Sequence, residues 1–177
     1  MSSSGENNND EVDTAIARIE RLFDARRYAE VVELCSKLLA QFPTDYRLYY
    51  HRAQAKTLVG DGQGAIADMT SAIAQNSAEP TLFYFRGLWE LDEGDQHAAA
   101  SDLQQAVEAE ARLGTSYYVE SARFARAIAL LFLGDYRQAE LECTHVRADL
   151  KTFAAGRRWT VNDVLNQAAR GQRPQAR

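Results

Sequence analysis

Residues 60–72 read GDGQGAIADMTSA, and residues 94–106 read GDQHAAASDLQQA. In both segments a Gly-Asp pair is followed at equal offsets by small and large apolar residues. A third copy, GDYRQAELECTHV, begins at Gly134, and the position one period before Gly60 holds Arg26. The first two copies begin 34 residues apart and the third follows after 40. A repeat of about 34 residues predicts an array of similar structural units.

Each Gly-Asp pair lies between two segments with helical periodicity. The preceding segments are aromatic or apolar, as in 46–59 and 82–93, and the following ones, such as 63–75 and 96–110, are rich in Ala with apolar residues three or four positions apart. The unit is therefore predicted to be helix, short turn, helix. Only Ala or Gly allows two helices to cross closely, which predicts helix contacts at Ala53, Ala65, Ala72, Gly87, Ala99, Ala106, Ala127 and Ala139.

In its period and in the order of large and small residues, the chain resembles the tetratricopeptide-repeat (TPR) family over residues 12–151. The resemblance implies an all-α fold, an α-solenoid of about four helix-turn-helix hairpins with a C-terminal capping helix. The hairpins are expected at residues 12–45, 46–79, 80–113 and 120–151. The sequence departs from the family at its first-helix tryptophan position, which holds Tyr49, Phe83 and Arg123.

The segments outside the repeats differ in composition. Residues 1–11 are polar and poor in hydrophobic side chains, so disorder is expected there. Residues 152–171 are expected to form a linker and the capping helix, because Thr160 and Asp163 have the spacing of a capping box with Asp in place of Glu. Residues 172–177 form a basic tail, for which a solvated terminus is favoured over binding of an anionic partner.

The composition excludes several kinds of partner. The 177 residues are 46% hydrophobic and 25% charged, as in ordinary globular proteins. No apolar run reaches the roughly 18 residues that a bilayer requires, so no membrane is expected as a partner. Residues 147–177 carry seven Lys or Arg and two Asp, which leaves a charge of −10 on the rest of the chain within the total of −5. An acidic body disfavours nucleic acid, because phosphate binding requires clustered cations.

The cellular setting is also predicted from composition. The first residues contain no basic segment followed by an apolar stretch, so a cytoplasmic location is expected. The preference for Arg over Lys, together with abundant Ala, suggests a bacterial genome.

A second periodic feature is charged. Each of three hairpins has an Arg on its first helix and an acidic residue 16 positions later on its second, which predicts the ion pairs Arg52–Asp68, Arg86–Asp102 and Arg126–Glu142. Arg does not transfer protons near neutral pH, so a structural role is favoured over a catalytic one. In the first hairpin Arg18 meets Leu34, and no such pair is expected there.

No catalytic, cofactor or metal site is predicted. Cys35 and Cys143 occupy the repeat position that Met69 and Leu103 fill in the other hairpins, and they are expected to be core residues. The three histidines, at positions 51, 97 and 145, lie at different repeat positions without ligands at metal-binding spacing. Because no phosphate loop or nucleophile elbow is present either, no enzyme activity and no small-molecule substrate are expected.

The TPR resemblance implies that the first helix of each hairpin lines a concave groove for a peptide or partner surface. In the first hairpin the implied positions are Ile16, Glu20 and Phe23. The residues predicted to bind a partner are Arg47, Tyr50, Gln54, Thr57, Tyr84, Leu88, Leu91, Phe124 and Ile128, with Leu131 and Arg123 near them. For Phe124, Ile128 and Leu131, burial in the core is an equally good interpretation.

Two functions are predicted from different classes. The first is a non-enzymatic protein–protein interaction module, a scaffold or adaptor. The alternative is a dedicated bacterial chaperone that shields a client's hydrophobic segment before export or assembly, and an accessory subunit of an enzyme is a third hypothesis. The carboxylate-clamp residues known in the family are not matched, since their positions hold Ile16, Glu20, His51, Thr81 and Phe85. The sequence predicts neither the partner's identity nor the oligomeric state.

Overall fold

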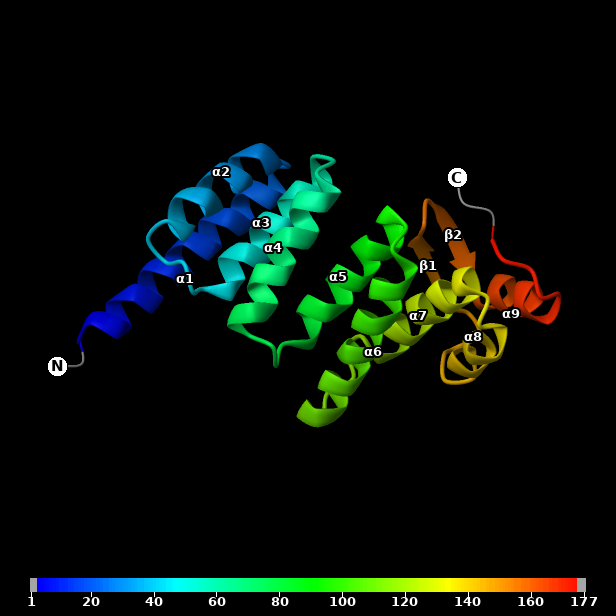
Figure 1. Ribbon diagram of the computed structural model, residues 1–177. Coiled ribbons are helices and arrows are strands. Elements are labelled where there is room, and N and C mark those ends of the chain that lie inside the picture. Colours follow the sequence, from blue (N-terminus) through cyan, green and yellow to red (C-terminus); the bar gives the residue numbers. More distant parts are fainter. Residues whose placement is uncertain (1–2, 175–177) are drawn as a thin grey trace. The chain divides into compact units, whose positions relative to one another are not determined.

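Helices make up most of the computed structural model, which describes residues 3–174 and their side chains from residue 10 onward. The chain divides into two compact units, Met1–Asn76 and Ser77–Arg177. The first unit contains α1 (Ser3–Asp24), α2 (Tyr28–Leu39), α3 (Tyr46–Leu58) and α4 (Gly62–Gln75) (Figure 1). The second contains α5 (Pro80–Glu93), α6 (Gln96–Leu113), α7 (Val119–Leu133), α8 (Tyr136–Cys143), β1 (Lys151–Ala154), β2 (Arg157–Thr160) and α9 (Val161–Ala169).

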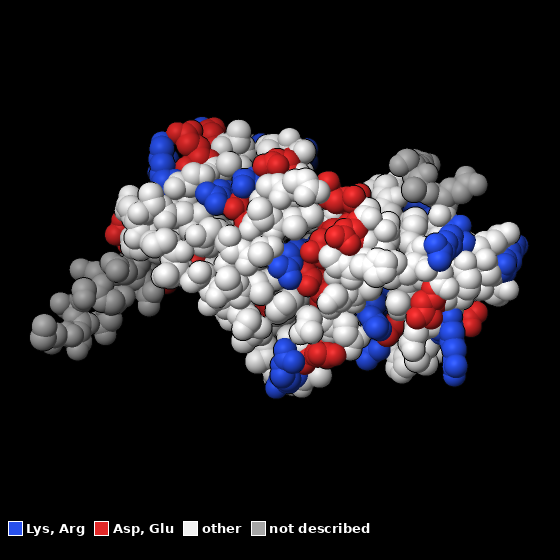
Figure 2. Space-filling model, in the orientation of Figure 1, with Lys and Arg blue, Asp and Glu red and all other residues white. Residues whose placement is uncertain are grey.

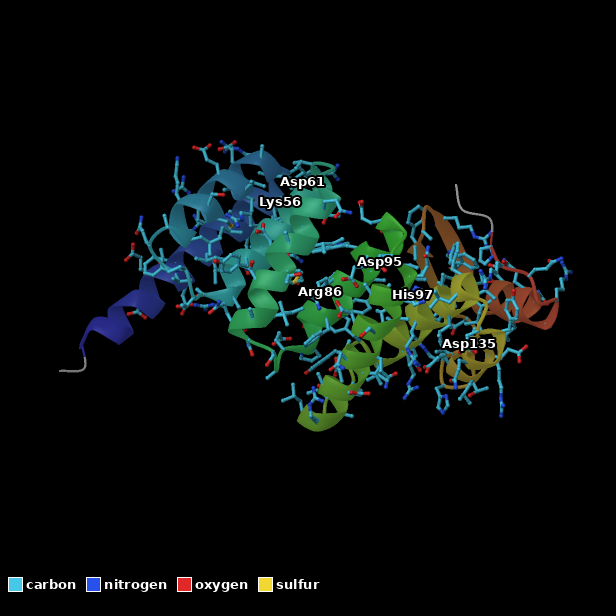
Figure 3. All side chains as sticks on the ribbon, in the orientation of Figure 1. Lys56, Asp61, Arg86, Asp95, His97 and Asp135 are labelled. Carbon is cyan, nitrogen blue, oxygen red and sulfur yellow. The ribbon has the colours of Figure 1, made fainter. Side chains whose placement is uncertain are left out.

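The repeated Gly-Asp pairs form the turns inside the hairpins. Gly60, Gly94 and Gly134 have φ angles of 87°, 88° and 84°, a left-handed conformation that ends the first helix without strain. Each following Asp then caps the second helix, its carboxylate accepting the N–H of the residue three positions on, as labelled for Asp61, Asp95 and Asp135 in Figure 3. In the first hairpin Arg26 takes the glycine's place, with a φ of 56°.

The small repeat residues lie where helices cross closely. All seven predicted alanines have no exposed surface, and Gly87 is buried. A Cβ atom added to Gly87 would lie 2.8 Å from Leu103 Cγ and 3.3 Å from the carbonyl oxygen of Ala99. The prediction of close helix contacts at these positions is therefore confirmed, and Gly87 leaves no room for a side chain.

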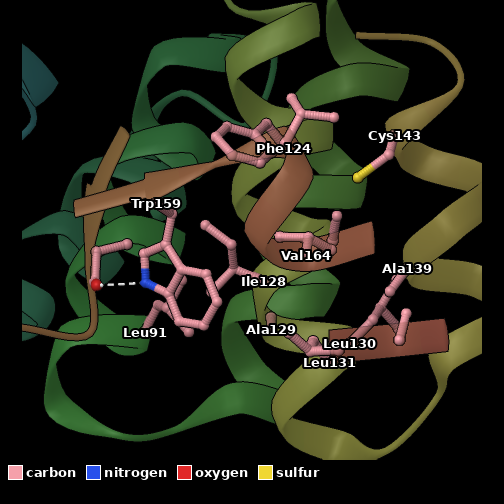
Figure 4. Packing of buried hydrophobic residues seen from close by; sticks show 14 of the residues in the cluster. Leu91, Phe124, Ile128, Ala129, Leu130, Leu131, Ala139, Cys143, Trp159 and Val164 are labelled. Carbon is pink, nitrogen blue, oxygen red and sulfur yellow. Dashed lines mark hydrogen bonds between the residues drawn. The ribbon is translucent and has the colours of Figure 1, made fainter. Parts of the chain in front are cut away.

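Each unit has its own hydrophobic core. In the first unit, buried side chains of α1, α2 and α3 pack together, among them Val12, Ile19, Val31, Cys35 and Leu48. In the second unit, α7 lies at the centre, and residues of α5, α8, the β-hairpin and α9 pack around it (Figure 4). Trp159 of β2 is completely buried there, near Leu91 and Ile128, and its Nε1–H donates to the Ala154 carbonyl oxygen at 3.0 Å.

The segment after the repeats differs from the prediction. Residues 151–160 form an antiparallel hairpin with Lys151 opposite Thr160 and Ala154 opposite Arg157, where a linker is predicted from the sequence. The turn residues Ala155 and Gly156 have φ angles of 49° and 73°, as a two-residue hairpin turn requires. The capping helix follows as α9, and its capping box has both hydrogen bonds, between Thr160 and Asp163.

The N-terminal segment also differs from the prediction. Residues 3–11 belong to α1, whereas disorder is predicted for residues 1–11. Buried Val12 and Ile19 anchor this helix. Its extension toward the N-terminus costs little free energy, because each added residue gains a hydrogen bond and no new helix has to be nucleated. Residues 1 and 2, like residues 175–177 of the predicted basic tail, lie outside the described part of the chain.

Candidate functional site

The three predicted ion pairs are all present. Arg52 Nε and Nη2 donate to the two carboxylate oxygens of Asp68 at 2.8 and 2.6 Å, and Arg86 binds Asp102 in the same bidentate way at 2.5 and 2.9 Å. Arg126 Nη1 donates to Glu142. The three carboxylates are between 4% and 6% exposed, so the pairs tie the helices of a hairpin together inside the molecule. The structural interpretation of this charge pattern is confirmed.

The two cysteine side chains are buried. Burial raises the pKa of the Cys35 thiol to about 12 and that of the Cys143 thiol to about 11, which keeps both as unreactive thiols. Among the described residues, no three His, Cys, Asp or Glu side chains are grouped to hold a metal ion. The partner-binding residues predicted from the sequence lie on the first helices α3, α5 and α7.

In the first unit, α1 and α3 bring five side chains into one surface, here called the α1–α3 surface: Glu20, Phe23, Tyr50, His51 and Gln54. The imidazole of His51 lies between two aromatic rings, 6.2 Å from Phe23 and 5.4 Å from Tyr50 between ring centroids. Gln54 Nε2 donates to the Tyr50 hydroxyl at 2.9 Å. Four of the five are half-buried and Glu20 is exposed, so the surface combines aromatic rings with polar groups that solvent reaches.

Burial determines the charge state of His51 in this surface. Burial lowers the pKa of its imidazole, and the nearby carboxylate of Glu20 and the hydrogen bond with Gln54 only partly oppose this shift. The ring is therefore neutral at pH 7. Its Nδ1 atom is buried and has no hydrogen-bond partner within the described residues.

Arg47, predicted to contact a partner, is held by carboxylates of its own unit. Its guanidinium donates to Asp45 at 2.7 Å and to Asp13 at 2.6 Å, which fixes α1 to the start of α3. Thr57, another predicted residue, is half-buried, and its hydroxyl donates to the Ala53 carbonyl oxygen at 3.2 Å. Both side chains lie on α3, but their polar groups are occupied by the fold.

In the second unit, Tyr84 belongs to an aromatic cluster with Phe85, Trp89 and Tyr118. The Tyr84 and Tyr118 rings are stacked, with centroids 4.6 Å apart and an interplanar angle of 22°, and Phe85 contacts Tyr118 edge-on. Burial raises the pKa of the Tyr84 hydroxyl, with a hydrogen bond to Ser121 acting in the opposite direction. Tyr84 and the neighbouring predicted residue Leu88 are half-buried. Tyr118 had no repeat signal in the sequence because it lies between α6 and α7, outside the residues that repeat.

Three predicted partner-binding residues lie in the core, which for Leu91 is a correction and for Phe124 and Ile128 agrees with the second interpretation of the sequence. Leu91 is 1% exposed, and Phe124 and Ile128 have no exposed surface; the same is true of Leu131. Their side chains pack in the cluster that also contains Ala154 and Trp159 of the β-hairpin. The first helices α5 and α7 are thus covered at these positions by residues of the C-terminal segment. The sequence predicts a capping helix in this segment, which is α9, but not the β-hairpin.

The chain also contains a buried carboxyl group that no sequence pattern indicates. Glu90 on α5 is 8% exposed, and its Oε2 atom has no hydrogen-bond partner within the described residues. Burial, with the nearby carboxylate of Asp102, raises the pKa of Glu90 to about 7, although Arg86 at 3.7 Å acts in the opposite direction. The group occupies the position that Lys56 has in the preceding hairpin, so the repeat pattern gave no reason to select it.

None of the helices in the described residues is long and apolar enough to cross a membrane. No protein-family model matches the sequence, and no curated protein matches it significantly. Solved structures, in contrast, are similar to it in fold. A structure of MamA has a TM-score of 0.74 at 12% identity, over 94% of this chain and 83% of that chain.

Two further solved structures are similar over about two thirds of this chain. The TPR2B domain of yeast Sti1, in a complex with pHsp70, has a TM-score of 0.63 at 18% identity, over 66% of this chain and 94% of that chain. The Yersinia enterocolitica type III secretion chaperone SycD, in complex with a peptide of the translocator YopD, has a TM-score of 0.61 at 15% identity, over 69% of this chain and 94% of that one. The chain therefore has the tetratricopeptide-repeat fold, an all-α solenoid of helical hairpins.

Proposed function

We propose that the chain is a non-enzymatic protein-interaction module, a scaffold or adaptor that binds a peptide segment or partner surface through its first helices. The observation that carries this proposal is the α1–α3 surface, where rings and polar groups remain accessible although the equivalent positions on α7 are buried. Aromatic side chains that are partly exposed and held rigidly are typical of binding hot spots.

The chemistry of the surface favours a partner segment with an apolar or aromatic anchor. Phe23, Tyr50 and the neutral ring of His51 offer apolar contact, while Gln54 and Glu20 offer hydrogen-bonding groups beside them. Glu20 is exposed and has no ion-pair partner among the described residues, so a cationic side chain on the partner fits next to the anchor. In the second unit, Tyr84 and Leu88 are half-buried residues of α5 that offer apolar contact of their own.

A dedicated chaperone is the second candidate. Its support is that SycD, a secretion chaperone with the same fold, was solved with a peptide of its translocator. The two functions differ in the fate of the complex: a chaperone releases its client on delivery, whereas a scaffold remains in the final assembly. A protein or peptide partner is common to both. A cytoplasmic location, a bacterial source and the absence of nucleic-acid, membrane, cofactor and small-molecule partners are parts of the same proposal.

The proposal is tested by affinity capture from an extract of the native cell, followed by mass spectrometry. Three baits are compared: the full chain, the double variant with Tyr50→Ala and Gln54→Ala, and a control variant with Gln105→Ala. The side chain of Gln105 on α6 is exposed. A partner that is retained by the full chain and the control but lost with the double variant supports the proposal. An identical set of proteins on all three baits would contradict it.

A further inference from the structure

Arg18 on α1 differs from the equivalent arginines of the other three hairpins. Arg52, Arg86 and Arg126 each bind a carboxylate on the second helix of their own hairpin. The position that would supply this carboxylate to Arg18 holds Leu34. Arg18 is exposed, and within the described residues its guanidinium has no ion pair and no hydrogen bond. The first hairpin therefore carries the cation of the repeated pair without the anion.

Arg18 and Leu34 line the same pocket, which is formed by α1 and α2. Its volume is about 290 Å³, at the lower end of the range for ligand-binding pockets. Leu22 and Leu34 supply the apolar part of its wall, and both are half-buried. The other lining residues are charged side chains of α2, namely Glu30, Glu33 and Lys37. A side chain that enters this pocket meets one guanidinium and two leucines.

The two carboxylates at the pocket are already bound by cations of their own segment. Glu30 accepts two hydrogen bonds from Arg27, at 2.5 and 2.6 Å, and Glu33 accepts one from Lys37 at 2.6 Å. Figure 2 shows acidic and basic side chains next to one another on the part of the chain that contains α1 and α2. With Arg18, the pocket has three cations and two carboxylates around it, a net charge of +1. This charge fits one carboxylate of another molecule.

The other charged side chains of α1 do not neutralise Arg18. Successive residues of a helix are rotated by about 100°, so Glu11 is the acidic residue of 10–24 on the same side, two turns away at about 10 Å. Arg21, closer to Arg18, is an exposed cation. Glu20 and Phe23 lie on the opposite side of α1 by the same rotation. The pocket is therefore separate from the α1–α3 surface.

We propose that this pocket binds an amphipathic helix of a protein partner, which presents a Glu side chain to Arg18 and a Leu side chain to Leu22 and Leu34. The carboxylate then takes the place that Asp68 has beside Arg52, and the guanidinium binds it through two parallel hydrogen bonds. The site goes beyond the proposed function and does not depend on the α1–α3 surface.

The spacing of the pocket residues determines the spacing on the partner. Arg18 and Leu22 are four residues apart on one side of α1, and a Leu and a Glu four residues apart on another helix have the same separation. Neighbouring helices of a hairpin stack run antiparallel, as α1 and α2 do. A partner helix that continues the stack beyond α1 meets Leu22 before Arg18, so Leu precedes Glu in its sequence.

The chemistry of the pocket favours this partner over others. A groove between two helices accepts a third helix, because side chains of one helix insert between those of its neighbours. A basic segment would bring a second cation next to Arg18. Nucleic acid requires clustered cations, whereas the described residues provide one unpaired cation at this pocket.

The proposal is tested by NMR on the full ¹⁵N-labelled chain, titrated with a helical peptide that is acetylated and amidated at its ends. The peptide consists of Ala and Gln, with one Leu and, four residues later, one Glu at its centre. The expected result is chemical-shift change centred on the amides of Arg18, Leu22 and Leu34. A second peptide with Gln in place of Glu is expected to bind at least about tenfold more weakly, because it lacks the charge-assisted hydrogen bonds.

Variants identify the group that binds the Glu side chain. Arg18→Gln removes an exposed cation and is expected to retain the fold but lose the preference for the Glu peptide over the Gln peptide. Arg112→Gln is the matched control, since Arg112 on α6 is exposed and the same charge is lost. Leu34→Asp supplies the acidic residue that the other hairpins have, so it is expected to pair with Arg18 and abolish binding. Tyr50→Ala is expected to have no effect.

Three outcomes would overturn the proposal. The first is equal binding of the Glu and Gln peptides to the unaltered chain, which would mean apolar contact alone and does not depend on any variant being folded. The second is an unchanged preference for the Glu peptide in Arg18→Gln, which would mean that another cation binds the carboxylate. The third is chemical-shift change centred on Tyr50 and His51, which would place the peptide on the α1–α3 surface and leave the proposed function intact.

Discussion

Arg52 and Asp68 join α3 to α4 through two parallel hydrogen bonds, and Arg52 Nη1 also donates to Ser36 on α2 at 3.1 Å. One guanidinium thus connects three helices of the first unit. Lys56 adds a second cation to the same carboxylate at 2.9 Å. Removing Asp68 would leave two cations near each other without their shared partner.

We expect Asp68→Asn to lower the free energy of unfolding by about 2–4 kcal/mol, because breaking one side of a buried pair leaves the other uncompensated. Arg52→Lys is also expected to lower the free energy of unfolding, since a lysine cannot bind both carboxylate oxygens in the same way. Urea unfolding followed by circular dichroism measures the effect. As a control, Lys37→Ala breaks an exposed pair with Glu33 and is expected to cost less than about 1 kcal/mol. Equal losses for Asp68→Asn and Lys37→Ala would refute the structural role.

Glu90 makes the stability of the second unit depend on pH. Because the folded pKa is raised to about 7, above the ordinary 4.5, the folded state favours the protonated form. The stabilising contribution of Glu90 is therefore greatest below about pH 4.5, falls as the pH rises to about 7, and is constant above that. At pH 8 the Glu90→Gln variant is expected to be more stable than the unaltered chain by about 1–3 kcal/mol.

Thermal unfolding at pH 4.5, 6 and 8 measures the difference in stability between the Glu90→Gln variant and the unaltered chain. This difference in stability is expected to become smaller as the pH falls, because the protonated carboxyl and the amide then resemble each other. A difference that is the same at all three pH values would show that Glu90 is ionised in the folded state as readily as in the unfolded one. Glu108→Gln, on the exposed side of α6, is the control and is expected to have no pH-dependent effect.

Both cysteines are expected to be inert toward thiol reagents in the native protein. Their thiols are buried, 0% and 5% exposed at Cys35 and Cys143, and the pKa values are raised to about 12 and 11. Reaction with a coloured disulfide reagent is expected to be slow without denaturant and to reach both thiols in 6 M guanidinium. Rapid labelling of Cys143 in the native state would mean that α9 and the hairpin open readily.

Substitutions of the buried residues of α7 are expected to lower the stability of the protein and to leave partner binding unchanged. Ile128→Ala removes a fully buried side chain beside Trp159 and is expected to cost about 2–4 kcal/mol. Gln54→Ala, on the accessible α1–α3 surface, is expected to cost less than about 1 kcal/mol. Chemical unfolding of the two variants makes the comparison. Small losses at both positions would indicate that the hairpin is not firmly packed on α7.

The hairpins were predictable because each depends on local chemistry repeated along the chain. Gly60 and Asp61 are examples. Gly60 adopts the left-handed conformation that ends α3, and Asp61 caps α4, so each residue type indicates its structural role. The ion pair between Arg52 and Asp68 was predictable for the same reason. A fixed spacing within a repeat becomes a fixed contact between two helices.

The candidate site was predictable only in part, because burial depends on segments far away in sequence. Tyr50 and Phe124 occupy equivalent repeat positions, and both are aromatic, so nothing local distinguishes them. Phe124 is buried in the cluster that contains Trp159, a residue of the segment that follows the last repeat. The hairpin that carries Trp159 was missed since its strands have four residues each, too few to show an alternating pattern.

Binding of a protein partner by the first helices is proposed to depend on the α1–α3 surface. The most direct measurement is the dissociation constant of a captured partner segment for the full chain, determined by calorimetric titration with and without Tyr50→Ala and Gln54→Ala. We expect at least a tenfold weaker affinity for the double variant and an unchanged affinity for Gln105→Ala. An affinity that is the same for all three proteins would contradict it.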